Sequence, residues 1–518
     1  MSKLFGIALA LAAALSVHAS TDFVMNNSSE PQSLDPALTS GVPESRLSYS
    51  LFEGLVVNDA KTSEPVPALA DKWTISADKK TYTFHIRPAK WSDGNPITAQ
   101  DFVNSWLRVL DPKTASPYAY LLGDSIEGAR DYNAGKGAAQ DVKVKAVDAQ
   151  DLQVTFVGPL PYALNMLTHN SFTVTPSQVI AKYGAEWVKP EHFVGSGPFM
   201  LKSWRPQDRI VVVKNPNYWD AKNVKLDSIT YLPIEDQNVA YDKFKAGEID
   251  YLPDDSVPVG KIDEIKLRKD YQHLAGSSVY YFIFNTTRKP FDDVRVRKAL
   301  AMGVNRQDLV DKVLKAGDVA SPGLVPAIQG YQTTKGNGFD LTEAKKLLAE
   351  AGYPNGQGFP KVELIYNTSA RHKLICEYIQ QAWKANLGVD IELKNLEWNT
   401  FLDTRQKSHD FLVARAGWLA DYPDAGNYLD MFRTGSGNND GLYSNKQYDK
   451  LMTEAALMAG GPKRNAVMEQ AEAILIDKDQ AVSPWFFYVN KSLVNQAKWG
   501  GVYANAMDIH PTKWIFKK

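Results

Sequence analysis

A chain of 518 residues is too long for one compact core, so two or three domains are expected. Its 44% hydrophobic and 23% charged residues are ordinary for a water-soluble globular protein. The 58 Lys+Arg against 59 Asp+Glu leave a formal charge of -1, so no overall attraction to nucleic acid or anionic lipid is expected.

The N-terminus has the layout of a secretory signal peptide. The charge of Lys3 precedes an apolar run at residues 4–17, which is too short to span a bilayer comfortably. We expect cleavage between Ala19 and Ser20; the alternative is a buried N-terminal helix. No cysteine stands at the cleavage site and no second run of spanning length follows. The mature chain is therefore predicted to be a soluble, non-lipidated protein of a Gram-negative periplasm.

The mature sequence mixes strand and helix patterns. Residues 22–58 hold short strand-like runs broken by prolines, and Thr98 is a good N-cap for a helix at 99–110. Further strands are expected at 81–87, 142–147, 152–157, 210–214, 228–234, 279–284, 361–366, 389–393 and 481–489, and further helices at 238–247, 293–303, 306–316, 342–352, 371–386 and within 455–476. The first half is richer in strands and the second alternates strands and helices, which predicts separate lobes.

No signature of catalysis is present. The sequence has no nucleophile elbow, zinc-protease pair or phosphate-binding glycine loop, and its 8 His are scattered without metal-ligand spacing. We therefore expect a binding protein and not an enzyme, with no cofactor and no metal. The single cysteine, Cys376, lies in a helical pattern and is predicted to be a buried core thiol.

One acidic residue stands out. An apolar run at 411–414 predicts a strand entering the interior, Gly417 permits close backbone approach, and Pro423 ends any regular ladder. Asp421 is thereby placed just after a buried strand and needs a cation or several donors. Either the partner is internal, as in a structural ion pair or a capped turn, or the cation belongs to a ligand.

Several motifs resemble those of the periplasmic solute-binding proteins of ABC importers that take up oligopeptides (solute-binding protein family 5), a group that includes the murein-peptide binder. The resemblance covers essentially the whole mature chain. It is carried by the segments 32–36 (QSLDP), 51–55 (LFEGL), 90–94 (KWSDG), 116–118 (SPY), 215–219 (NPNYW), 293–297 (DVRVR), 397–405 and 414–424. The last two segments are specific to the oligopeptide subgroup.

The resemblance implies an α/β fold of two hinged lobes (class II) with an extra domain inserted in the first lobe. After the signal peptide at 1–19, we expect lobe I at 20–52, 178–277 and 489–518, the inserted domain at 53–177 and lobe II at 278–488. Such lobes close around the ligand, which lies extended and pairs its backbone with protein strands.

The resemblance also implies roles for individual residues. Asp421 would hold the α-ammonium of a peptide, and Arg415, Arg405 and His372 would receive its carboxylate. An internal salt bridge is the alternative for each arginine, and helix capping or packing is the alternative for His372. The remaining expected contacts are the main chain of Gly417, Trp418, Leu419 and Val42 and the side-chain pockets of Tyr118, Trp398 and Ser40.

Three positions depart from the pattern that the resemblance implies. Ser40 stands where an acidic residue is expected, and Ile283 replaces a polar residue, so peptides containing Lys are expected to bind less well. Leu419 stands where relatives carry a disulfide cysteine, which fits the lone Cys376.

The implied function is capture of short peptides, about two to five residues long, and their delivery to an inner-membrane ABC permease by a monomeric receptor. The alternatives keep the fold and change the ligand to a murein tripeptide, a dipeptide, haem or a metal chelate. An exported peptidase would need a catalytic constellation that the sequence lacks, and a secondary chaperone-like role stays open.

Overall fold

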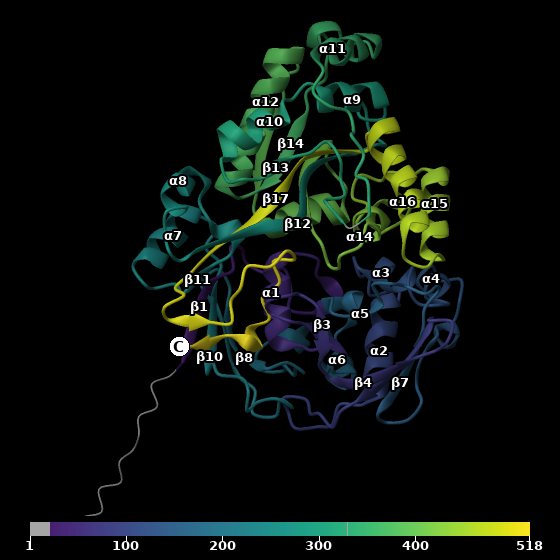
Figure 1. Cartoon of the computed structure of the whole chain (residues 1–518), viewed down its shortest axis with the longest axis vertical. Helices are drawn as coiled ribbons and strands as arrows, with labels where there is room; N and C mark the ends of the chain where they lie inside the picture. Colours follow the sequence, from purple (N-terminus) through teal and green to yellow (C-terminus); the bar gives the residue numbers. More distant parts are fainter. Residues whose placement is uncertain (1–20, 329) are drawn as a thin grey trace, which may run out of the picture.

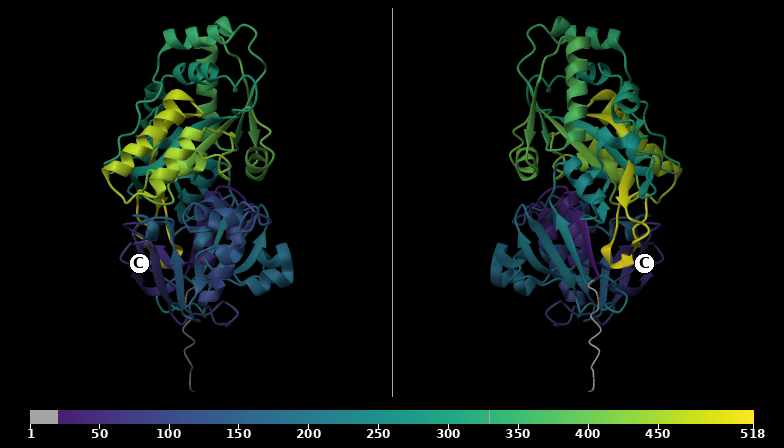
Figure 2. Two further views of the ribbon diagram at one scale, coloured as in Figure 1. Left: turned by 90° about the vertical axis from the view of Figure 1, so that its right-hand side faces the viewer. Right: turned by 90° about the vertical axis from the view of Figure 1, so that its left-hand side faces the viewer.

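The computed structural model describes residues 21–328 and 330–518. The predicted signal peptide and its cleavage site lie outside the described residues. Two lobes are stacked along the long axis of the molecule (Figure 1): the lower one, lobe I, contains the first part of the chain and the C-terminus, and the upper one, lobe II, contains residues from the second half. Side views show the same stacking with a narrower region between the lobes (Figure 2).

Among the described residues, one sheet runs through both lobes in the order β15-β14-β16-β12-β17-β11-β1-β10-β9-β8, and β13 pairs with β17. Its strands are β1 (Asp22–Asn26), β8 (Phe199–Arg205), β9 (Arg209–Lys214), β10 (Ser228–Leu232), β11 (Tyr251–Leu252), β12 (Tyr271–Phe284), β13 (Val319–Ala320), β14 (Glu363–Asn367), β15 (Glu392–Leu396), β16 (Val413–Leu419) and β17 (Val482–Val494). The strands from β11 to β8 belong to lobe I, and those from β15 to β16 belong to lobe II (Figure 1).

The long strands β12 and β17 cross from one lobe to the other. They pair antiparallel from Tyr271↔Leu493 to Ile283↔Val482, with register shifts between Ala275 and Val279 and between Tyr280 and Tyr281. Such irregularities bend a strand and increase its twist. The sheet is therefore continuous between the lobes but locally irregular where the chain passes from one to the other.

A smaller antiparallel sheet, β4 (Ala70–Ile75), β5 (Thr81–Ile86), β7 (Asp151–Thr155) and β6 (Val144–Ala146), lies beside lobe I and is covered by helix α2 (Ala99–Leu110). The helix begins at the predicted residue because Thr98 and Asp101 form a capping box, in which the Thr98 N–H donates to Asp101 Oδ2 at 2.8 Å. Trp106 on its inner face is fully buried. Burial of such a side chain contributes about 2–3 kcal/mol to folding.

Helices cover the sheet of lobe II. The predicted β-α-β unit is confirmed as β14, α12 (Ala370–Leu387) and β15, with the two strands parallel. Cys376 on α12 is a buried free thiol, as predicted. The other main helices are α1 (Val42–Leu51), α7 (Gln237–Lys245), α9 (Val294–Met302), α11 (Leu341–Glu350), α13 (Trp398–Leu402), α15 (Lys446–Ala456) and α16 (Pro462–Glu472); shorter ones are α3 (Ala119–Gly123), α4 (Ala129–Asn133), α5 (Ala163–Met166), α6 (Ser177–Tyr183), α8 (Ile262–Ile265), α10 (Arg306–Asp308) and α14 (Gly426–Leu429).

The structure corrects four local predictions. Residues 42–51 form helix α1 where strand-like runs were expected, because Gly41 caps the helix and Pro43 occupies its first turn, where proline favours a helix. Strand β12 begins eight residues before the expected start, and β15 lies three residues later than expected. Strand β16 continues to Leu419, so Gly417 lies inside the strand and not after it.

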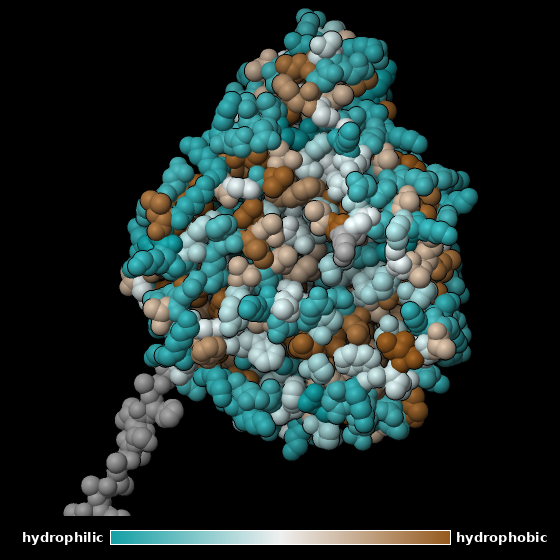
Figure 3. Space-filling view, in the orientation of Figure 1, coloured by the Kyte–Doolittle hydropathy of each residue, from teal (hydrophilic) through white to brown (hydrophobic). Residues whose placement is uncertain are grey.

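The surface is largely hydrophilic. On the face drawn in Figure 3, hydrophilic residues dominate the periphery of both lobes, and apolar residues are more frequent toward the middle of the molecule. No helix among the described residues is long and apolar enough to cross a membrane.

Candidate functional site

A cavity lies between the two lobes, and all eleven residues expected to contact the ligand line it: Ser40, Val42, Tyr118, His372, Trp398, Arg405, Arg415, Gly417, Trp418, Leu419 and Asp421. They come from α1 and the segment before it, from the residue that precedes α3, and from α12, α13 and the helical turn after it, β16 and the following loop. The structure therefore brings together residues that are as much as 381 positions apart, between Ser40 and Asp421.

Strand β16 has one open edge on the cavity side. One edge pairs with β12 along its whole length, whereas the pairing with β14 among the described residues is confined to Val413 and Ala414. The N–H of Ala420 donates to Ser277 O, and antiparallel strands alternate the residues that face their neighbour. The main-chain groups of Arg415, Gly417 and Leu419 thus face away from β12. An extended ligand backbone can add there as another strand.

Asp421 is set at one end of this edge, two residues after β16. Its side chain is 11% exposed; Asn427 Nδ2 donates to Oδ2 at 3.1 Å, and His169 Nε2 lies 3.4 Å from Oδ1. No Lys or Arg in the part of the chain that the structure describes forms an ion pair with it. Burial raises the pKa of the Asp421 carboxyl, and His169, Asn427 and Tyr118 oppose that rise.

His169 does not supply a full positive charge to this carboxylate. Its Nδ1 accepts a hydrogen bond from the Ser171 N–H at 3.2 Å, which assigns the ring proton to Nε2 in the neutral form. Burial lowers the His169 pKa, and its ring packs at a tilt against Tyr118 with 4.2 Å between the ring centroids. The acid is hydrogen-bonded but not neutralised, so its surroundings favour an external cation.

Arg415 lies at the other end of the open edge and has no acidic partner among the described residues. Its Nη1 donates to Asn367 Oδ1 at 3.1 Å and its guanidinium lies 5.4 Å from the centre of the Tyr280 ring, but none of the described carboxylates forms an ion pair with it. His372 lies beside the same ring at 5.7 Å. Burial, together with Arg415 and Arg371, lowers the pKa of His372, so this histidine is neutral near pH 7.

Arg405 differs from Arg415 because its guanidinium already has an acidic partner. Its Nε lies 2.7 Å from Asp440 Oδ2, and the Asp440 side chain is 3% exposed. The internal salt bridge considered as the alternative for the arginines is therefore present for Arg405 in this arrangement. Burial raises the pKa of Asp440 to about 6, although Arg405 opposes that shift.

Several cavity residues connect the two lobes. Ser40 Oγ bonds to the side chain of Gln406 at 3.2 Å, and Trp398 Nε1 donates to Glu44 Oε1 at 3.2 Å. Tyr118 is buried and stacks with Trp418 at 6.2 Å. Ile283, one of the two positions on which the expectation about Lys-containing peptides rested, is buried and does not line the cavity. Only Ser40 still bears on that expectation.

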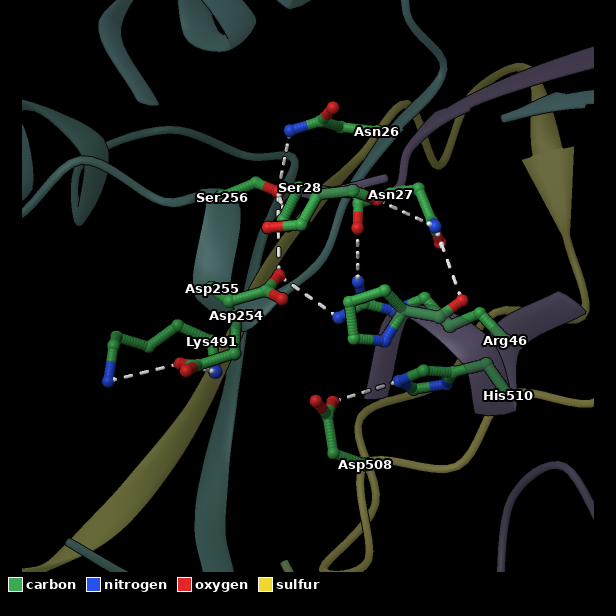
Figure 4. A network of polar contacts seen from close by, with 12 residues as sticks. Asn26, Asn27, Ser28, Arg46, Asp254, Asp255, Ser256, Lys491, Asp508 and His510 are labelled. Carbon is green, nitrogen blue, oxygen red and sulfur yellow. Dashed lines mark hydrogen bonds and ion pairs between the residues drawn. The ribbon is translucent and has the colours of Figure 1, made fainter. Parts of the chain in front are cut away.

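The lobe I side of the cavity is a network of paired ionisable and polar groups (Figure 4). Arg46 Nη2 donates to Asp255 Oδ1 at 3.0 Å, and His510 Nε2 lies 3.0 Å from Asp508 Oδ1. Lys491 Nζ is 3.2 Å from Asp254 Oδ1.

Sequence reasoning missed this network, as well as His169, Arg371 and Glu44. Except for the Asp508–His510 contact, the partners are separated by more than 100 residues, so no local spacing announces them. Among the described residues, no group of three His, Cys, Asp or Glu side chains is arranged to hold a metal ion.

Comparisons with known proteins agree with this geometry. Residues 64–440 match the model of the bacterial extracellular solute-binding proteins, family 5 Middle. The periplasmic oligopeptide-binding protein OppA of Salmonella typhimurium is 40% identical over 491 residues, which are 93% of this chain and 89% of OppA. The complex of Haemophilus influenzae OppA with RPPGFSPFR superposes with a TM-score of 0.91 at 35% identity, covering 96% of this chain and 99% of OppA.

The murein tripeptide binding protein MppA indicates which arrangement of the lobes is present. One structure of Escherichia coli MppA gives a TM-score of 0.91 (33% identity, 96% of this chain and 99% of MppA). The unliganded open form of MppA gives only 0.62 (34% identity, 96% and 97%). The lobes of this chain are thus arranged unlike those of the open form, in agreement with the hydrogen bonds between them. Because the match covers most of the chain, this protein belongs to family 5 of the bacterial extracellular solute-binding proteins.

Proposed function

We propose that this protein captures short peptides between its lobes in the periplasm and delivers them to an inner-membrane ABC permease. The observation that carries the proposal is the placement of two charges without internal ion-pair partners, Asp421 and Arg415, along one open strand edge. A zwitterion with an extended backbone satisfies both charges and the edge at once. Relatives whose names state oligopeptide and murein peptide binding support the same ligand class.

In this proposal, Asp421 receives the α-ammonium, assisted by Asn427 and His169. Gly417 and Leu419 pair with the ligand backbone through the open edge, and the N–H of Val42, in the first turn of α1, is a further donor. A Cβ at Gly417 would lie 3.1 Å from the Tyr488 hydroxyl, so the absence of a side chain there leaves room beside the edge.

Arg415 receives the carboxylate, with His372 beside it. Asp421 lies six positions after Arg415, a span of ~20 Å along an extended strand. Both side chains line the cavity, and we propose that peptides of about two to five residues bind between them. Arg405 then acts through its ion pair with Asp440, which holds the wall of the cavity near Phe401.

Pockets for the ligand side chains follow from the same arrangement. Tyr118 and Trp398 supply aromatic walls that suit varied side chains, and Ser40 adds a small polar group. We further propose that the lobes are residues 20–52, 178–277 and 489–518 and residues 278–488, hinged at β12 and β17, with 53–177 as the inserted domain. The mature protein is proposed to act as a monomer after removal of the first 19 residues.

Native mass spectrometry of the purified mature protein, followed by denaturation to release its ligand, tests the function. We expect a ladder of short peptides with mixed sequences. A single defined species, such as a murein tripeptide, would keep the fold and narrow the ligand. If the protein is purified empty, calorimetric titration with free tripeptides replaces the release experiment, and absence of binding to any peptide would contradict the proposal.

A further inference from the structure

A buried ion pair joins the two lobes at the wall of the cavity. Arg371, in the first turn of α12 in lobe II, donates from Nη1 to Asp254 Oδ2 and from Nη2 to the main-chain oxygen of Asp254, both at 2.7 Å. Asp254 follows β11 in lobe I. The two side chains are only 5% and 13% exposed, and both line the cavity. The cavity is therefore closed at this point by charges from opposite lobes.

Asp254 is supported from behind by the strand that links the lobes. Its Oδ1 accepts from the Lys491 main-chain N–H at 3.1 Å and lies 3.2 Å from Lys491 Nζ. Lys491 is buried on β17 and also reaches Asp318 of lobe II at 3.3 Å. Arg371 and Lys491 together hold the pKa of Asp254 below its usual range despite burial. The carboxylate is thus ionised and fixed in place.

The neighbouring residue has a different partner. Asp255 pairs with Arg46, and both of these residues belong to lobe I (Figure 4). The two ion pairs are adjacent in the chain, and all four side chains line the same cavity. Of these two pairs, only Arg371–Asp254 depends on how the lobes are arranged, so the more exposed Asp255 offers a neighbouring control within lobe I.

The pair stands at the basic end of the cavity. Arg371 immediately precedes His372, whose ring shares the Tyr280 neighbourhood with Arg415. Arg371 carries another guanidinium near this end of the cavity, but that group is already paired with the Asp254 carboxylate. A ligand whose carboxylate ends at Arg415 leaves the pair intact. We expect a longer ligand, whose carboxylate extends past Arg415, to reach this pair.

We propose that the Arg371–Asp254 ion pair is an end stop that sets the upper length of the bound ligand, an inference that rests on the proposed peptide-binding function. To extend past Arg415, a peptide carboxylate must replace Asp254 as the partner of Arg371 while the lobes remain closed. Asp254 would keep Lys491 in that exchange. The pair thereby discriminates by length without contacting the side chains of shorter ligands.

The test measures calorimetric affinities of the ligand-free mature protein for free-acid alanine peptides of three to six residues. Asp254→Asn leaves Arg371 available to the ligand, so we expect the ratio of pentapeptide to tripeptide affinity to rise by about tenfold or more, the effect of one charge-assisted contact. Asp255→Asn is expected to leave that ratio unchanged. Arg371→Met removes the receiving cation, so it should favour longer peptides only when their C-terminus is amidated.

The outcomes separate this inference from the proposed function. If the parent binds no peptide of any length, the proposed function fails. If the parent and Asp254→Asn bind tripeptides but share one length profile within about twofold, the end stop is wrong. If thermal melting shows that Asp254→Asn is unfolded, the affinities of Arg371→Met for amidated peptides provide the test. The inference is overturned if this variant binds longer amidated peptides no more tightly than the parent does.

Discussion

The lobe I side of the cavity and the open edge of β16 differ in whether their charged side chains have internal partners. On the lobe I side, Arg46 pairs with Asp255 and Lys491 with Asp254, and each pair is held within hydrogen-bond distance. Along this edge, Asp421 has a neutral histidine, an amide and the Tyr118 side chain as partners, and Arg415 has an amide and an aromatic face. Burying an isolated charge costs free energy, whereas a charge that already has an internal partner can serve the structure without a ligand. The difference identifies Asp421 and Arg415 as the charges with which a ligand can pair.

The two arginines of lobe II make the same contrast within one region. Arg405 and Arg415 are equivalent in the sequence reading, since each is a cation near the specific motif. Arg405 has Asp440 at 2.7 Å, whereas Arg415 has Asn367 at 3.1 Å. The chemistry available to a ligand therefore differs although the residue type is the same.

The strongest test of the contrast is the removal of Asp421. Asp421→Ala should weaken binding of free-amine tripeptides by roughly 3–5 kcal/mol, because the ligand ammonium is buried without its partner. Isothermal titration calorimetry measures the loss. An N-acetylated tripeptide is the control, since it should bind parent and variant about equally poorly. Parent-like affinity of the variant for free-amine peptides would refute the role of Asp421.

Paired substitution of the two arginines sharpens the comparison. Arg415→Met should weaken tripeptide binding by about 2–3 kcal/mol with little loss of thermal stability, because no protein carboxylate loses its partner. Arg405→Met should chiefly lower the melting temperature, because Asp440 is left buried and unpaired. For both variants, calorimetry measures the tripeptide affinity and thermal melting measures the melting temperature. The reverse pattern would mean that Arg405, and not Arg415, receives the carboxylate.

The pH dependence of affinity tests the raised pKa of Asp421. A bound ammonium favours the ionised carboxylate and so lowers this pKa, which means that binding releases a proton from the free protein. Affinity for free-amine peptides should accordingly be greatest above the raised pKa of Asp421 in the free protein and fall as the pH is lowered through that pKa. Protonation of His169 would add a competing cation and act in the same direction. N-acetylated peptides should lack this dependence on Asp421, and an identical slope for both would contradict it.

The smallest expected effect concerns ligand side chains. Ser40→Glu should increase affinity for Lys-containing tripeptides relative to matched Ala tripeptides by about 1 kcal/mol, because it restores an acidic group at the cavity wall. The parent should prefer the Ala peptides. Competition binding with the two peptides measures the preference. Equal affinities in the parent would remove the reason to assign selectivity to Ser40.

Local patterns predicted much of the secondary structure correctly. The helix at 99–110 follows from Thr98 and a one-sided apolar face, and the β-α-β unit around Cys376 follows from alternating apolar periods. The helix at 42–51 was missed because Pro43 was taken as a break in a strand, whereas proline in the first turn favours a helix. The extent of β12 was missed because its first eight residues, 271–278, mix polar, small and apolar side chains without regular alternation, and their pairing with β17 is set by tertiary contacts.

The sequence by itself determined that Asp421 follows a buried strand and that the chain carries the motifs of a solute-binding family. It also supplied eleven of the residues that line the cavity, because short motifs preserve the local backbone that presents them. Only the tertiary structure decided which charges are already neutralised. Asp440 lies 35 residues from Arg405, Asp254 lies 117 from Arg371 and His169 lies 252 from Asp421, so these contacts depend on the tertiary structure. The first contact forms within lobe II, whereas the other two depend on how the lobes meet. The sequence gives the sign of each charged side chain, but the fold decides whether that charge has a partner of opposite sign.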